Sequence, residues 1–156
     1  RNLTHIPKPV ITDVNVQDML LALVLLHKRE AEASNVEIVL NVSPDDIHIK
    51  ADKSQIEQVV INLIKNAIQS FDEQIDRKIE VKAFYSDKRR PIISVKDNGN
   101  GIDEEALEKI FIPFFTTKKN GSGIGLSLSR QIMRQHQGML GVKTKMDEGT
   151  EFFLRF

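Results

Sequence analysis

Asp97 ends an apolar run and is followed within four residues by two glycines, in the stretch VKDNGNGIDEEALEKIF (residues 95–111). A carboxylate at the end of a strand, deep in a pocket, is costly unless a hydrogen-bond donor meets it. The exocyclic amine of adenine is such a donor, whereas guanine would present an oxygen there; one charged hydrogen bond contributes roughly 1.5–3 kcal/mol. Gly99 and Gly101 would let the backbone approach a ligand closely. The stretch is a candidate adenine site.

Two other interpretations fit the same stretch in part. A plain strand–turn–helix junction with Asp103 as the helix N-cap explains it about equally well. A calcium loop is suggested by the oxygen atoms of Asp97, Asn98 and Asp103, but Gly99 and Gly101 occupy positions where an EF-hand needs oxygen ligands. The calcium loop is rejected, and the adenine site and the plain junction both stay open.

Asn62 and Asn66 lie four residues apart in QVVINLIKNAIQSF (58–71) and therefore share one face of a predicted helix. Their amide oxygens are suitable ligands for a hard cation. Mg²⁺ takes one or two protein oxygens and completes its shell with phosphate oxygens and water. For an isolated pair of this kind, solvated helix amides are the simpler explanation.

Three glycines, Gly121, Gly123 and Gly125, precede a predicted helix in NGSGIGLSLSRQIM (120–133). Their backbone N–H groups and the positive helix end favour a phosphate. A flexible hinge is the alternative, and the spacing is neither a dinucleotide fingerprint nor a P-loop.

Just upstream, IFIPFFTTKK (110–119) combines Phe111, Phe114 and Phe115, which look exposed, with Lys118 and Lys119, which could reach phosphates. Packing of the phenylalanines beneath a loop is compatible with this interpretation.

The elements that must position these residues alternate between strands and helices. Alternating or apolar runs predict strands at 10–16, 36–42, 47–52, 78–85, 91–97, 139–145 and 150–156. The second and third of these are separated by the turn SPDD. Helices are predicted from Gln17 to about Ser34, from a capping box at Asp52 and Gln55 to about Phe71, and at 104–111 and 124–137. Several strands are linked as hairpins, so the prediction is an α/β fold. We expect a two-layer sandwich with a mixed sheet of about five strands and about three helices on one face.

Composition fits one globular domain, since the 156 residues are 40% hydrophobic and 28% charged. The 22 basic and 22 acidic residues cancel, so no bulk attraction to nucleic acid or to a membrane surface is implied. The absence of cysteine excludes disulfides and thiol chemistry. We expect a linker at 1–9 and a domain at 10–156, cut from a longer protein and located in the cytoplasm.

Taken in order, the four motifs resemble the N, G1, F and G2 boxes of the catalytic ATP-binding domain of bacterial sensor histidine kinases, which belongs to the GHKL superfamily. The resemblance extends over 10–156 and includes EGTEFFLRF (148–156), which is similar to the last glycine-containing box. PFFTTK and GSGIGLSLSRQIM are most similar to kinases of the nitrogen-regulation type.

The resemblance implies the roles of individual residues. Asn66 would bind Mg²⁺ with the phosphates of ATP, Asn62 would support it, and Lys118 would lie near the γ-phosphate. Gln69 departs from the family, where a basic residue is common, so the phosphate charge would rest more on Lys118, Lys119 or Lys65. Residues 116–122 would form a lid over the nucleotide. The other nucleotide-binding residues would be Asp97, Gly99, Gly101, Ile102, Thr117, Gly121, Ser122, Gly123, Ile124, Gly125, Leu126 and Thr150.

The resemblance also implies an enzyme that transfers the γ-phosphoryl group of ATP to a histidine. Hydrolytic relatives carry a glutamate at the position of Asn62, and an amide cannot serve as a general base. The acceptor histidine of the family is followed by an acidic residue and then a proline. None of the four histidines fits, namely His5, His27, His48 and His136.

The acceptor is therefore expected on an upstream dimerisation domain, in a homodimeric parent that passes the phosphoryl group to a response regulator receiver domain. This segment itself is expected to contact neither nucleic acid nor a membrane. The alternatives are a GHKL-type ATPase and a non-catalytic nucleotide-binding scaffold.

Overall fold

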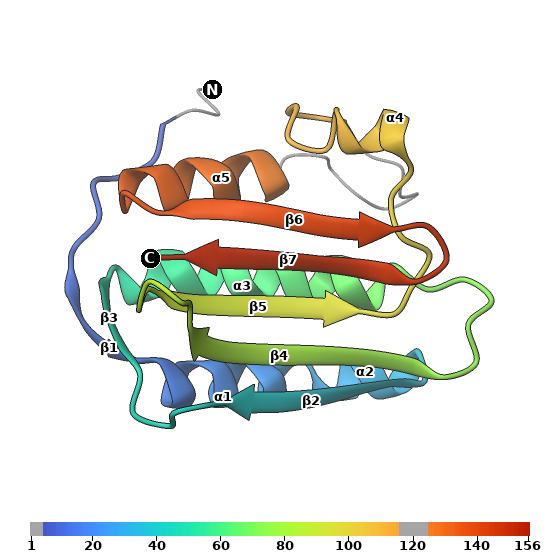
Figure 1. Ribbon diagram of the computed structural model, residues 1–156, viewed down its shortest axis with the longest axis horizontal. Helices are drawn as coiled ribbons and strands as arrows, with labels where there is room; N and C mark the ends of the chain where they lie inside the picture. Colours follow the sequence, from blue (N-terminus) through green and yellow to red (C-terminus); the bar gives the residue numbers. More distant parts are fainter. Residues whose placement is uncertain (1–4, 116–124) are drawn as a thin grey trace.

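The chain folds into two layers, a mixed sheet and a set of helices against one of its faces (Figure 1). The computed structural model describes residues 5–115 and 125–156. Its strands are β1 (Thr12–Asn15), β2 (Val36–Val42), β3 (His48–Ala51), β4 (Arg77–Tyr85), β5 (Pro91–Asp97), β6 (Met139–Lys145) and β7 (Gly149–Arg155). Its helices are α1 (Val16–Leu26), α2 (Lys28–Ala33), α3 (Lys53–Ile68), α4 (Glu104–Leu107) and α5 (Gly125–Gln135). The predicted α/β sandwich is confirmed.

Five strands form the main sheet in the order β2-β4-β5-β7-β6, and β1 pairs with β3 in a separate two-stranded sheet. β2 runs parallel to β4, from Val36 opposite Arg77 to Val42 opposite Ala83, and the other three pairs of the main sheet are antiparallel. A parallel pair needs a crossover connection, which β3 and α3 supply here. The strands on either side of the turn SPDD therefore pair with other strands and not with each other.

The helix predicted from Gln17 to about Ser34 is divided in the structure at His27. The backbone of His27 has φ −98° and ψ 3°, and its ring Nδ1 lies 2.8 Å from the carbonyl oxygen of Leu23. The ring thereby satisfies a carbonyl in the last turn of α1, and α2 begins at the next residue. His27 is only 3% exposed. It continues the buried face of the helix, so the apolar pattern does not reveal the break.

The central helix of the second layer is α3. Its buried residues recur at helical spacing and belong to the same core cluster as the inward-facing residues of β4 and β5. Burial of one aliphatic side chain stabilises the fold by about 1.5–3 kcal/mol, so this packing holds the helix firmly against the sheet. The helix ends at Ile68, a little before the predicted end near Phe71. Its buried residues are Ile56, Val59, Val60, Leu63, Ile64, Ala67 and Ile68.

Asp52 joins three parts of the chain at the N-terminus of α3. Its Oδ1 accepts a hydrogen bond from the backbone N–H of Gln55 at 3.1 Å, which confirms the predicted N-cap. Its Oδ2 accepts from the backbone N–H of Val10 at 2.9 Å, and its own N–H donates to Nε2 of His136 at 3.1 Å. The side chain of Gln55 donates to the carbonyl of Pro7 at 2.9 Å. The predicted capping box is therefore only half formed. The side-chain amide of Gln55 donates to Pro7, and the backbone N–H of Asp52 donates to His136 and not to Gln55.

Replacing Asp52 tests this junction. Asp52→Ala is expected to lower the free energy of unfolding by about 1 kcal/mol at pH 7, the usual cost of losing an N-cap. Hydrogen bonds from the N–H groups of Val10 and Gln55 hold the pKa of the Asp52 carboxyl below its ordinary value of 3.8. Because the folded pKa is lowered, this stabilisation is present above about pH 4 and is lost as the pH falls further.

Urea unfolding at pH 7 and at pH 3 checks the prediction, which requires a smaller difference between wild type and variant at pH 3. Asp87→Ala, which removes an exposed carboxylate between β4 and β5, is the matched control and should change little at either pH. An equal loss for Asp52→Ala at both values would contradict a role for the carboxylate charge.

Candidate functional site

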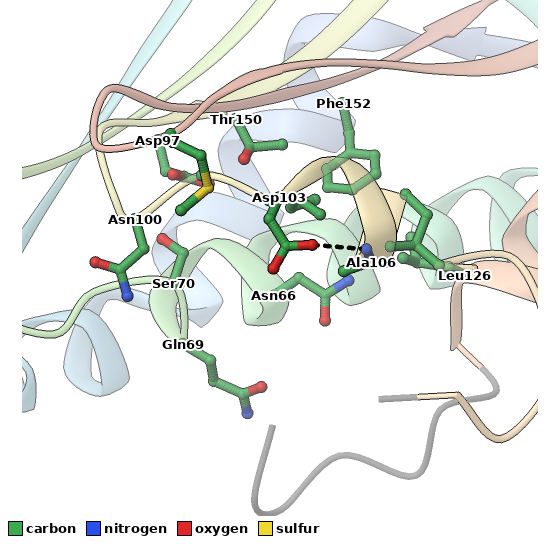
Figure 2. Close-up of a pocket in the computed structure, with 14 residues that line it drawn as sticks. Asn66, Gln69, Ser70, Asp97, Asn100, Asp103, Ala106, Leu126, Thr150 and Phe152 are labelled. Carbon is green, nitrogen blue, oxygen red and sulfur yellow. Dashed lines mark hydrogen bonds between the residues drawn. The ribbon is translucent and has the colours of Figure 1, made fainter. Parts of the chain in front are cut away.

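A cavity of about 270 Å³ lies between α3, α4 and the ends of β5 and β7 (Figure 2). Six of the residues predicted for the site line it, and they come from four elements and one loop. In Figure 2, Asp97 and Thr150 lie side by side at one end of the cavity, and Asn66 and Leu126 lie toward the other. The six are Asn66, Asp97, Gly101, Ile102, Leu126 and Thr150.

Asp97 and Thr150 are direct partners in the register of β5 and β7, and each is 5% exposed. A carboxylate this deeply buried needs hydrogen bonds. One comes from the backbone N–H of Gly99, which donates to Asp97 Oδ1 at 2.9 Å. The two paired strands, β5 and β7, thus bring two oxygen-bearing side chains to the same end of the cavity, which can receive a ligand with N–H donors.

The helix N-cap considered in the sequence is present as well. Asp103 Oδ1 accepts from the backbone N–H of Ala106 at 2.7 Å and caps α4. This carboxylate also lines the cavity. The interpretation as an adenine site and the interpretation as a strand–turn–helix junction are therefore compatible. The Asp97 carboxylate lies at the cavity, and the Asp103 carboxylate caps the helix that follows.

The loop after β5 packs directly against the turn between β6 and β7. The backbone N–H of Asp147 donates to the carbonyl of Asn100 at 2.8 Å. Gly101 has φ +78°, and a Cβ at this position would collide with the carbonyl of Lys145. Glycine is required here both for its backbone angles and for the close approach. One wall of the cavity is consequently fixed to the edge of the sheet.

The two asparagines of α3 occupy different environments. Asn66 lines the cavity, whereas Asn62 lies against Gly125 at the start of α5, where a Cβ would collide with its amide. The Nδ2 atom of Asn62 is buried and has no hydrogen-bond partner within 5–115 and 125–156. A donor in this position is available to a phosphate or to another acceptor at the start of α5.

The remaining predicted residues fall in two groups. Gly99 does not line the cavity, and a Cβ at this position would collide with Ser70, which does line it. The others, Thr117, Lys118, Gly121, Ser122, Gly123 and Ile124, lie outside the described residues, as does the predicted lid.

The three phenylalanines expected to be exposed differ from one another. Phe114 is 65% exposed, but Phe111 and Phe115 are partly buried against the core cluster. The guanidinium of Arg130 lies 4.8 Å from the centre of the Phe111 ring, a cation–π contact that joins this segment to α5. The packing interpretation holds for two of the three rings.

Sequence reasoning missed several residues that line the cavity. Phe152 follows Thr150 by two positions and so shares its face of β7, a signal that period-two alternation offers. Ala106 and Ile110 lie four residues apart at α4 and just after it, on one side of that segment. Ser70, Asn100 and Met146 also line the cavity, and so do Gln69, which the sequence marked only as a departure from the family, and Asp103, which it marked only as a helix cap. All five lie outside the helices and strands.

The described part of the chain contains no cluster of three or more His, Cys, Asp or Glu side chains able to hold a metal ion. Within the same residues, no helix is long and apolar enough to cross a membrane. A divalent cation in the cavity would need amide oxygen, as on Asn66, and oxygens supplied by the ligand.

Comparison with known proteins places the chain in a family. The family described as "Histidine kinase-, DNA gyrase B-, and HSP90-like ATPase" matches residues 51–156. Sporulation kinase A of Bacillus subtilis is 34% identical over 143 residues, which are 92% of this chain and 23% of that protein. The chain spans less than a third of the length of the curated relatives it matches.

Solved structures agree with this match. The catalytic domain of histidine kinase ThkA superposes with a TM-score of 0.82 and 31% identity, covering 94% of this chain and 95% of that one. ThkA has also been solved in complex with the response regulator protein TrrA, with a TM-score of 0.77 and 29% identity over 95% of this chain and 42% of that one. Full-length ShkA in complex with AMPPNP gives 0.81 and 27% identity over 93% of this chain and 30% of that one. The chain therefore belongs to the histidine kinase-, DNA gyrase B- and HSP90-like ATPases, and within them it is a catalytic domain of the histidine kinase type.

Proposed function

We propose that the cavity beside Asp97 binds ATP with Mg²⁺, and that the domain delivers the γ-phosphoryl group to a histidine on a separate dimerisation domain. The observation that carries the proposal is the pairing of Asp97 with Thr150 at one end of the cavity and Asn66 toward the other. The oxygens of Asp97 and Thr150 can accept hydrogen bonds from the amine of a base. The amide oxygen of Asn66 can bind a cation that also binds the phosphates.

At the base end, the Asp97 carboxylate accepts the exocyclic amine of adenine. The apolar side chains of Ile102, Ile110 and Phe152 line the same cavity and offer the ring an apolar wall. A 6-keto base would bring an oxygen against the carboxylate, which is unfavourable in a buried site. This end of the cavity therefore selects adenine over guanine.

At the phosphate end, Asn66 supplies an amide oxygen to Mg²⁺, which takes its remaining ligands from phosphate oxygens and water. Asn62, one turn earlier, offers its buried Nδ2 to a phosphate oxygen near the first turn of α5. We extend the phosphate site to Lys118 and to the glycines at 121, 123 and 125. The bound ATP supplies the group that is transferred.

The domain is built for transfer to another domain and not for hydrolysis. Asn62 has no basic group with which to activate water, and phosphoryl transfer then depends on positioning and charge neutralisation. Of the histidines, His27 is buried and His136 has both ring nitrogens engaged, by Ile132 and Asp52. His48 is paired with Asp13 on the surface.

The acceptor and the partners are proposed to lie beyond this chain. Residues 1–9 would be a linker from upstream helices that dimerise and carry the acceptor histidine, and 10–156 the catalytic domain. The phosphoryl group would pass from that histidine to a response regulator, a step consistent with the ThkA–TrrA complex. We place this domain in the cytoplasm, where ATP is available.

Asp97→Asn is expected to weaken ATP binding by roughly 1.5–3 kcal/mol, because a charged hydrogen bond to the adenine amine is lost. Calorimetry with Mg²⁺–ATP and Mg²⁺–GTP measures this, and wild type should prefer ATP. Asp103→Asn is a matched control, since it removes one charge from the same cavity and asparagine keeps the helix cap. Equal affinity of wild type for ATP and GTP would refute the adenine role of Asp97.

The chain alone should bind ATP without labelling itself or hydrolysing it appreciably. Adding the upstream helices should produce acid-labile, base-stable phosphohistidine from γ-labelled ATP, and Asn66→Ala should abolish it by removing a Mg²⁺ ligand. Gln58→Ala, on the same helix and outside the cavity, should leave labelling intact. Labelling of the isolated chain at His5, His27, His48 or His136 would contradict this division between domains.

A further inference from the structure

Thr144 contacts two residues that line the cavity, Ile102 and Thr150, without lining it. It stands on the edge strand β6, directly opposite Thr150 of β7 in the register of the two strands. Its side chain is half-buried, and its hydroxyl is the meeting point of three separate contacts. No motif of the sequence singles it out.

The directions of two of the three contacts imply the direction of the third. Thr144 Oγ1 accepts from the backbone N–H of Ile102 at 2.9 Å, lies 3.2 Å from the carbonyl oxygen of Gly149, and lies 2.8 Å from Thr150 Oγ1. A hydroxyl has one proton and two lone pairs. The carbonyl of Gly149 can only accept, so the Thr144 proton goes to it. All three contacts are hydrogen bonds only if Thr150 donates its own proton to Thr144.

We propose that Thr144 is a positioning residue for base selection, which makes the Thr150 hydroxyl an acceptor at the wall of the cavity. This inference rests on the proposed binding of adenine beside Asp97. With its proton held by Thr144, Thr150 offers only lone pairs to a ligand. The base end of the cavity then presents acceptors from two adjacent side chains, Asp97 and Thr150 (Figure 2).

An exocyclic amine has two N–H groups and can satisfy two such acceptors, directly or through a water. A carbonyl at the same position of the base has no proton to give and meets lone pairs from both sides. Thr144 also holds the N–H of Ile102, a lining residue, and so fixes the loop that follows Asp97. One hydroxyl outside the cavity thus sets both the shape and the polarity of its base end.

The test compares Thr144→Val with Thr144→Ser, using Mg²⁺–ATP and Mg²⁺–inosine triphosphate as probes in calorimetry. Valine keeps the size of the side chain but cannot accept the Thr150 proton, which is then free to point into the cavity. We expect ATP binding about five- to tenfold weaker, the loss of about one hydrogen bond, and a preference for ATP over inosine triphosphate reduced by a similar factor. Serine keeps the hydroxyl and should retain both wild-type values.

A double variant separates base selection from simple structural support. In a Thr150→Val background, where the hydroxyl that Thr144 controls is gone, Thr144→Val should no longer change the ratio of the two affinities. Thr12→Val, an exposed threonine on β1, controls for loss of a hydroxyl elsewhere. Should Thr144→Val not fold by circular dichroism, Thr144→Cys, which is a poor acceptor, gives the same readout.

The outcomes are distinguishable. Equal weakening of both nucleotides by Thr144→Val, or unchanged affinities, would overturn the inference while leaving the proposed function intact. A wild-type chain that binds neither nucleotide, or binds both equally, would overturn the proposed function and this inference with it.

Discussion

A carboxylate at the end of a central strand is only 5% exposed, and the surrounding backbone is arranged to keep it there. The Asp97 carboxylate accepts a hydrogen bond from the N–H of Gly99. The chain then approaches Lys145, at the end of β6, closely at Gly101. At Gly149, φ is +125° and a Cβ would collide with the carbonyl of Asp97. Two loops are therefore packed closely against the strand end that carries this carboxylate, and one of them supplies a hydrogen bond to it. The same arrangement leaves an acceptor-rich end to the cavity.

The side of the cavity that Asn66 and Leu126 line is formed by α3 and α5. These two helices are joined to each other at the ends that lie away from the cavity. α3 and α5 pack together, and His136 at the C-terminal end of α5 accepts the N–H of Asp52 at the start of α3. At the opposite end of the same pair, Gly125 approaches Asn62, and Leu126 lines the cavity with Asn66. The start of α5 is thus held in place beside the asparagines.

Much of this could be predicted from the sequence, because the signals were local. The strand 91–97, the N-caps at Asp52 and Asp103, and the closing hairpin follow from alternation and capping, which depend on neighbouring residues. The break at His27 could not be predicted from local patterns, because it depends on the contact of one ring with a carbonyl. The parallel pairing of β2 with β4 could not be predicted either, because it depends on the crossover between these strands.

The site divided in the same way. Asp97, Asn66 and Thr150 stand in motifs that predicted them, and all three line the cavity, whereas Thr144 is connected to it through contacts with residues 42 and 6 positions away. A hydroxyl of that kind has no sequence signature. The resemblance of the four motifs supplied the family, but only the contacts show how the sheet edge supports the cavity.

The proposed hydrogen bond between the buried Asp97 carboxylate and the amine of adenine is tested most directly by measuring the affinities of two proteins for two nucleotides. The affinities of wild type and Asp97→Asn should be measured for ATP and for the triphosphate of purine riboside, which has hydrogen in place of the amine. Removing the amine is expected to weaken binding to wild type by roughly 1.5–3 kcal/mol and to have a much smaller effect on the variant. An equal effect of the missing amine on both proteins would contradict it.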